Sequence, residues 1–278
     1  MSYFDNLTID NIKIGIAIST FTENKTSGKR YDIIEKSLNS LNKYLESTNL
    51  NIYTVVVVDG DIPQRHNSIL NEVNNLNKNI IIHKREKNGG VARTKNTSIR
   101  LLLEQNVDIG FLMDDDVYYK KDCFEQYVNA IINGKIHHIG FCQMHPLVHP
   151  KNEWEKMGYI QTNINGQEVM KHGGGGVGCL LSFTKRVIEK IGYFKVMSGK
   201  YGYEHINFTH RCVENGLIPF PNDIIEPLKY IDHIGFEPVG YNKFNKSHSI
   251  SESYRKTENS KNKYEWKLDM NKYVKCIE

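Results

Sequence analysis

Three consecutive aspartates, Asp114 to Asp116, are the residues of this chain best suited to chemistry. They follow the apolar run 109–113 and precede Val117. A buried strand that ends in several carboxylates gathers negative charge at one point, where a cation would relieve the repulsion. Oxygen ligands of this kind suit Mg²⁺ or Mn²⁺, which keep water and accept substrate phosphates as further ligands. The alternative is a solvated acidic loop that caps the next helix, because aspartates are also common in turns.

A second candidate is the segment 88–96, which reads NGGVARTKN. Glycines that open a helix let the backbone approach a ligand closely, and a helix N-terminus favours anions. Arg93 lies in the expected first turn, where its guanidinium could bind a phosphate through a charge-assisted fork. The alternative is a surface helix with ordinary basic residues, and the spacing differs from that of a P-loop.

The second half of the chain holds three further candidates. Four successive glycines at 173–176 would let the backbone pass close to a substrate, although a flexible linker has the same composition. Glu204 and His205 stand together where a helix is expected to begin, and they offer a carboxylate and an imidazole for proton transfer. Glu204 would equally well stabilise the helix N-terminus. His233 would join the aspartates only if the fold brings it to them.

Alternating strands and helices are expected to position these residues. Apolar and β-branched runs predict the strands, and apolar residues at helical spacing predict the helices. The strands are expected at 13–19, 51–58, 79–84 and 108–113, and the helices at 31–45, 67–76 and 91–105. This alternation predicts an α/β fold with a mostly parallel sheet covered by helices on both faces. Thr20, Asp59 and Asp114 follow strand ends, so we expect them at the edge where such sheets bind ligands.

The second half is expected to be less regular. The predicted elements are helices at 124–133, 185–191 and 203–215 and strands at 136–144 and 179–183. The stretch 145–171 is expected to be irregular and polar, with Trp154 and Tyr159 as packing points. Residues 237–278 are rich in lysine, asparagine and serine, a composition that suits either a flap or an ordered tail.

The composition excludes several classes of protein. The net charge of +4 is spread over 278 residues without basic blocks, so charge alone does not indicate a nucleic-acid partner. Five widely spaced cysteines without a CxxC pair predict reduced thiols and neither a zinc site nor disulfides. No apolar run approaches the about 20 residues of a membrane span, and the first residues lack the apolar core of a signal peptide. A cytoplasmic protein without a transmembrane segment is therefore expected.

The order of these motifs resembles that of GT-A-fold glycosyltransferases of the family 2 type. The resemblance covers roughly residues 12–236 and rests on Ser19-Thr20, Asn88-Gly-Gly-Val-Ala-Arg93, Asp114 to Asp116, Gly-Tyr-Glu204-His205 and His233. It implies a GT-A fold in a single domain at 1–278. Within that domain it implies a nucleotide-sugar-binding half at 12–118, an acceptor and catalytic half at 119–236, and a C-terminal flap or tail at 237–278.

The resemblance also implies a role for each site residue. The nucleotide-sugar would be held by Thr20, Asp59, Arg93, Asp114 and Asp115, and a Mn²⁺ or Mg²⁺ ion by Asp114, Asp116 and His233. Glu204 and His205 would be catalytic, because inverting members carry a Glu-Asp pair at this place. Here the second residue is histidine, and the stretch also resembles the Trp-Gly-Gly-Glu-Asn of retaining N-acetylgalactosaminyltransferases. Both stereochemical outcomes therefore stay open.

The implied function is metal-dependent transfer of a hexosyl or N-acetylhexosaminyl group. The donor would be a nucleotide-sugar, with a UDP-sugar expected, and the acceptor a hydroxyl of a glycan or a protein-linked glycoconjugate. Two alternatives remain. A sugar-phosphate nucleotidyltransferase also pairs an α/β sheet with metal-binding aspartates. A non-catalytic nucleotide-sugar-binding module is kept open by the histidine beside Glu204.

Overall fold

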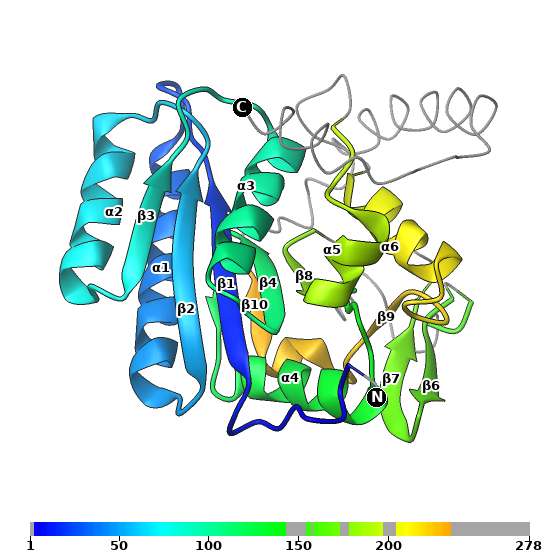
Figure 1. The fold of residues 1–278 in the computed structure, drawn as a ribbon. Coiled ribbons are helices and arrows are strands. Elements are labelled where there is room, and N and C mark those ends of the chain that lie inside the picture. The colour runs from blue at the N-terminus through cyan, green and yellow to red at the C-terminus, as the bar shows by residue number, and fades with distance from the viewer. Residues whose placement is uncertain (1–2, 143–153, 157, 173–177, 197–203, 235–278) are drawn as a thin grey trace.

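A five-stranded sheet in the order β3-β2-β1-β4-β8 carries the fold of the computed structural model (Figure 1). The structure describes residues 3–142, 154–156, 158–172, 178–196 and 204–234. The parallel strands are β1 (Lys13–Thr20), β2 (Asn51–Val58), β3 (Ile80–Lys84) and β4 (Ile109–Asp114), and β8 (Leu180–Thr184) is antiparallel to β4. The predicted α/β fold with a mostly parallel sheet is confirmed.

The register of the central strands brings their carboxyl ends to one level. Ser19 pairs with Asp114 across β1 and β4, and Thr20 pairs with Val58 across β1 and β2. The backbone N–H of Asp59 donates to the carbonyl of Thr20 at 3.0 Å, which fixes the first residue beyond β2 at the same edge. The polar residues that follow the strands therefore meet at a single edge of the sheet.

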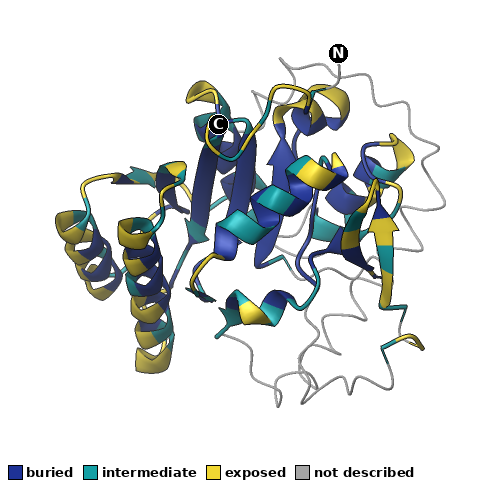
Figure 2. Ribbon diagram, turned by 90° about the horizontal axis from the view of Figure 1, so that it is seen from below, coloured by how far each residue is buried: buried dark blue, intermediate teal, exposed yellow. Residues whose placement is uncertain are grey.

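Three helices connect the parallel strands and cover both faces of the sheet. They are α1 (Gly28–Ser47), α2 (Gln64–Leu76) and α3 (Val91–Glu104), each close to its predicted bounds. In Figure 1, α3 lies in front of the sheet and α1 behind it. The apolar stripe of α1 is fully buried at Ile34, Leu38 and Leu41, and Figure 2 shows the exposed residues of the helices turned away from the sheet. The helical spacing of apolar residues therefore predicted these three helices correctly.

The second half departs from the predictions in two places. The strand predicted at 136–144 is wrong within the described residues, where Gly140 forms only an isolated bridge with Leu181. The N–H of Gly140 donates to the carbonyl of Asn222, whereas the N–H of Phe141 donates to that of Leu180. The N–H of Ile139 donates to the side-chain hydroxyl of Ser182, whose carbonyl accepts from His138 Nδ1, so side chains take the bonds that would extend this bridge into a ladder.

The stretch expected to be irregular contains a β-hairpin instead. Strands β6 (Ile160–Ile164) and β7 (Gln167–Lys171) pair antiparallel around the turn Asn165-Gly166. Both turn residues have positive φ, 50° and 92°. An Asn-Gly pair between two strands is the strongest short-range hairpin signal, so this element was readable from the sequence.

The remaining elements close the fold around the acidic end of β4. Helices α4 (Cys123–Gly134), α5 (Lys185–Ile191) and α6 (Glu204–Glu214) confirm the predicted helices. The other elements are β5 (Val117–Tyr119), β9 (Asn222–Asp223), the 3-10 helix η2 (Pro227–Lys229) and β10 (Ile231–His233). β9 pairs with β7, and β10 pairs antiparallel with β5. The β5–β10 pair thus returns the chain to the aspartates.

Several other expectations concern packing. Trp154 and Tyr159 pack against Cys142 and Met170, as predicted. The four cysteines within the described ranges are buried and unpaired, and Cys276 lies outside them. No helix in the described part of the chain combines the length and apolarity that a membrane crossing requires. The division at 118 and 119 stays a prediction, and 237–278 lie outside the described residues.

The contact between Gly110 and Phe183 gives a test of the sheet packing. A Cβ added at Gly110 in β4 would overlap the Phe183 ring, which is 1% exposed on β8. We expect Gly110→Ala to lower the free energy of unfolding by about 1–3 kcal/mol, measured by urea denaturation, because the ring has no room to move. Gly28→Ala is the matched control, since the nearest atom, in Arg65, would be 3.5 Å away. Equal stability of Gly110→Ala and wild type would contradict this packing.

Candidate active site

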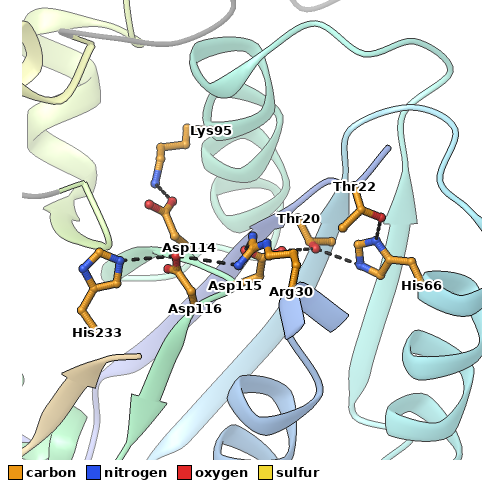
Figure 3. A network of polar contacts seen from close by, with 9 residues as sticks. All are labelled: Thr20, Thr22, Arg30, His66, Lys95, Asp114, Asp115, Asp116 and His233. Atoms are coloured by element: carbon orange, nitrogen blue, oxygen red, sulfur yellow. Dashed lines mark hydrogen bonds and ion pairs between the residues drawn. The ribbon is translucent and has the colours of Figure 1, made fainter. Parts of the chain in front are cut away.

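Each of the three aspartates has its own basic partner, and each partner comes from a different element (Figure 3). The pairs are Lys95–Asp114 at 2.8 Å, Arg30–Asp115, and His233–Asp116 at 3.3 Å. Lys95 lies on α3, Arg30 on α1 and His233 on β10. Three adjacent carboxylates repel one another, so side chains of the protein itself supply the compensating charge.

The β5–β10 pair brings His233 to the acidic trio, defined as Asp114 to Asp116. His233 pairs with Val117, directly after the trio, and the N–H of Ile234 donates to the Asp116 carbonyl at 2.8 Å. The late histidine of the sequence therefore lies beside Asp116. The convergence of these two predicted metal ligands depends on an antiparallel pairing between distant parts of the chain.

The Asp116–His233 contact behaves as an ion pair. Burial alone would raise the pKa of Asp116, but the hydrogen bond and charge of His233 lower it below the usual value. Burial likewise opposes the charged form of His233, yet Asp116 raises the pKa of the imidazole above 6.5. The Oδ1 atom of Asp116 is buried and has no hydrogen-bond partner within the described ranges.

A divalent cation fits this carboxylate only with help from other ligands. No group of three or more histidine, cysteine, aspartate or glutamate side chains in the described part of the chain is arranged to hold a metal ion. The Asp114 carboxylate is instead engaged by Lys95. An ion at the unpaired oxygen of Asp116 would therefore complete its shell with substrate oxygens and water, as Mg²⁺ and Mn²⁺ commonly do. The role of Asp114 as a metal ligand stays a prediction.

Asp115 is buried and fully engaged by the protein. Its side chain receives hydrogen bonds from the Thr20 hydroxyl at Oδ2 and from Arg30 at Oδ1. Burial raises the pKa of Asp115 to about 6, against the opposing charge of Arg30. The contacts continue from Thr20 to His66, whose Nε2 lies 2.9 Å from the Thr20 hydroxyl, and from His66 Nδ1 to the Thr22 hydroxyl at 2.8 Å.

Sequence reasoning missed Arg30 and His66. His66 is fully buried on α2, although it was one of 11 histidines without a distinguishing motif. Arg30 lies in the first turn of α1 and has the sequence context of an ordinary surface cation. No pattern in the chain marks either residue, because their position depends on how α1 and α2 approach the end of β4.

Asp59 ties the end of β2 to the loop before α3. Its carboxylate accepts the backbone N–H groups of Gly89 at 3.0 Å and Gly90 at 2.8 Å, and it pairs with Arg85. Arg93 donates to the carbonyl of Gly89 at 3.4 Å, so it borders the same loop. Asp59 and Arg93 thus border the same loop, and their roles in holding a nucleotide stay predictions.

Glu204 and His205 connect to the trio through Lys95. The Lys95 ammonium donates to the carbonyl of Gly178 at 3.1 Å, and a Cβ at Gly178 would overlap the His205 ring. His205 Nε2 lies 3.1 Å from Glu204 Oε1. Burial alone would raise the pKa of Glu204, but the hydrogen bond from His205 lowers it, so the carboxylate is ionised at neutral pH.

The glycine run at 173–176 and residues 201–203 lie outside the described residues. Among those described, contacts or chain adjacency connect all the predicted site residues in one network: Thr20, Asp59, Arg93, Asp114, Asp115, Asp116, Glu204, His205 and His233. Lys95 is a further member to which the sequence reading gave no role. Its side chain is completely buried, which its place among basic residues in segment 88–96 did not reveal.

Comparisons with known proteins agree with this architecture. Residues 16–192 match the model of Glycosyl transferase family 2. An uncharacterized glycosyltransferase of Acanthamoeba polyphaga mimivirus is 35% identical over 271 residues, which are 96% of this chain and 97% of the relative.

Two solved structures of TarS from S. aureus share the fold. One gives a TM-score of 0.53 at 15% identity over 77% of this chain, and TarS 1–349 in complex with UDP-GlcNAc gives 0.53 at 15% identity over 81%. This chain spans 35% of the first TarS chain and 61% of the second.

The buried His66 predicts how stability depends on pH. Burial and the charge of Arg30 lower its pKa from 6.5 to about 4. The unfolded state therefore binds more protons between those values, and the free energy of unfolding should fall on acidification by up to about 1.4 kcal/mol per pH unit. In His66→Gln, whose side chain does not titrate, chemical denaturation at several pH values should give a flatter dependence. The exposed His210, changed to Gln, is the control; equal slopes for His66→Gln and wild type would contradict the assignment.

Proposed function

The chain belongs to glycosyl transferase family 2, and on that basis we propose that it transfers a sugar from a nucleotide-sugar to a hydroxyl group of a glycan or protein-linked acceptor. The observation that carries the proposal is the meeting of the acidic trio and His233 at the carboxyl edge of the sheet. Open α/β sheets bind ligands at this edge. The complex of TarS 1–349 with UDP-GlcNAc supports a UDP-sugar as the donor.

We infer that Asp116 and His233 hold a Mn²⁺ or Mg²⁺ ion, and that His233 gives up the proton of its ion pair with Asp116 when the ion binds. The unpaired, buried Oδ1 of Asp116 supports this, because an orphaned carboxylate oxygen gains most from a cation. When bound, such an ion would neutralise the negative charge that grows on the departing diphosphate. Asp114, held by Lys95 with its side chain 34% exposed, would face the ribose.

The loop before α3 would form the nucleotide side of the site. Asp59 fixes the backbone of Gly89 and Gly90, so the loop is held in shape before a ligand arrives. Arg93 beside Gly89 would then meet the base or the diphosphate. A preorganised loop avoids an ordering cost on binding.

Glu204 and His205 would handle the proton of the acceptor hydroxyl. The Glu204 carboxylate accepts a hydrogen bond from His205 Nε2, which favours the imidazole tautomer that is protonated at Nε2. The Nδ1 atom, which has no partner among the described residues, then carries the lone pair that can take a proton. Glu204, ionised next to it, is the alternative proton acceptor.

The first test measures nucleotide binding through thermal stability. UDP with Mn²⁺ should raise the free energy of unfolding by about 2.7 kcal/mol at 100 times the Kd, because the ligand binds only the folded state. Asp116→Asn should abolish the Mn²⁺-dependent part of the shift. Asp61→Asn is the control, since that side chain is 94% exposed. Absence of any shift with UDP, GDP or ADP plus metal would argue against the proposal.

The second test separates binding from chemistry. His205→Asn and Glu204→Gln should keep the UDP affinity, and the substitution of the true proton acceptor should lower kcat about 100- to 10,000-fold. The readout is UDP released from UDP-GlcNAc, and His210→Asn on the exposed side of the same helix is the control. An unchanged kcat in both variants would remove the pair from the mechanism. Release of pyrophosphate from UTP and a sugar phosphate would favour the nucleotidyltransferase alternative.

A further inference from the structure

We propose that Arg30 is a further donor-binding residue whose guanidinium contacts the departing diphosphate. We also propose that a one-way chain of hydrogen bonds from Thr22 through His66, Thr20 and Asp115 holds it in place. This inference rests on the proposed function, since it names a contact to the donor of that reaction. It also changes the part played by two residues that the sequence assigned to nucleotide binding, Thr20 and Asp115.

The direction of the chain follows from its last member. A carboxylate only accepts hydrogen bonds, so the Thr20 hydroxyl gives its single hydrogen to Asp115. The Thr20 oxygen must then accept from His66 Nε2 at 2.9 Å, which places the imidazole proton on Nε2. A neutral imidazole has one donor and one acceptor, so His66 Nδ1 accepts from the Thr22 hydroxyl at 2.8 Å.

This direction fixes what each residue can offer a ligand. The Thr20 hydroxyl has no hydrogen left to donate, and Thr20 is 3% exposed. Asp115 is equally buried, with its oxygens taken by Thr20 and Arg30. Thr22 and His66 are also buried, at 3% and 0% exposure. These four residues are therefore positioning residues, and the guanidinium at the end of their chain is the group that can reach a ligand.

Arg30 lies where the leaving group would form. It pairs with Asp115, and its NH1 atom lies 3.8 Å from Oδ2 of Asp116, the proposed metal ligand. Its side chain is 30% exposed. Contacts with two carboxylates engage only part of its five N–H donors, and the planar fork of a guanidinium suits phosphate oxygens. A diphosphate held at Asp116 thus has Arg30 as its neighbour (Figure 3).

The alternative is a purely structural ion pair that fastens α1 to the end of β4. A phosphate contact and a structural ion pair differ in one measurable respect. A phosphate contact changes the affinity for UDP and leaves the affinity for uridine unchanged, because uridine has no phosphate. A structural pair alters the stability of the fold and affects both ligands alike.

The experiment compares UDP and uridine by titration calorimetry with Mn²⁺ present. In Arg30→Lys, which keeps the charge but loses the fork, the affinity for UDP should fall about 10- to 100-fold, the range of a charge-assisted hydrogen bond, while that for uridine holds. The double variant Arg30→Met/Asp115→Asn removes both charges and should show the same UDP-specific loss if Arg30→Lys folds poorly. Arg65→Lys is the matched control, because Arg65 is exposed and pairs with Asp32.

The chain of hydrogen bonds from Thr22 to Asp115 can be tested separately. In ¹⁵N NMR spectra of the wild-type protein, His66 should be a neutral imidazole protonated at Nε2, and His66→Phe should weaken UDP binding without affecting uridine. Protonation of His66 at Nδ1 would overturn the proposed direction of this hydrogen-bond chain. Equal losses for UDP and uridine in Arg30→Lys, or no loss, would overturn the phosphate contact. A wild-type protein that binds uridine but gains nothing from the phosphates of UDP would overturn the proposed function and this inference together.

Discussion

The repulsion among three adjacent carboxylates is the constraint on which the rest of the structure depends. Two like charges about 4 Å apart repel by roughly 4 kcal/mol at an effective dielectric constant of about 20. Lys95 of α3, Arg30 of α1 and His233 of β10 each pair with one of these carboxylates. Three separate elements that pack around one strand end therefore each contribute one of the compensating charges. The same packing defines the candidate site.

The first half of the fold could be predicted because its signals are local. Apolar runs marked β1 to β4, and the apolar stripes of α1 to α3 gave the intervening helices. The hairpin at 160–171 has an equally local signal in its Asn165-Gly166 turn, although the stretch was predicted to be irregular. Residues 136–142 could not be predicted in the same way. Their pairing with β8 is interrupted where the Ser182 hydroxyl and the His138 ring take backbone hydrogen bonds, and such competition by side chains leaves no periodic pattern in the sequence.

The candidate site was predictable in its acidic members and hidden in its basic ones. Asp114 to Asp116 could be predicted because they end an apolar strand. Arg30 and Asp115 are 85 residues apart, and nothing in the sequence of α1 distinguishes that arginine from a solvated one. Lys95 is completely buried between Asp114 and Gly178, against the usual preference of lysine for the surface. Sequence reveals the charge that needs compensation, whereas tertiary structure decides which cation provides it.

The β5–β10 pair has a consequence for the synthesis of the protein. A ribosome translates the strands β1 to β4 and the trio long before it reaches residues 231–233, which form β10. Throughout that interval Asp116 lacks its imidazole partner. Completion of the candidate site, in which Asp116 meets His233, therefore waits until residue 233 has been synthesised.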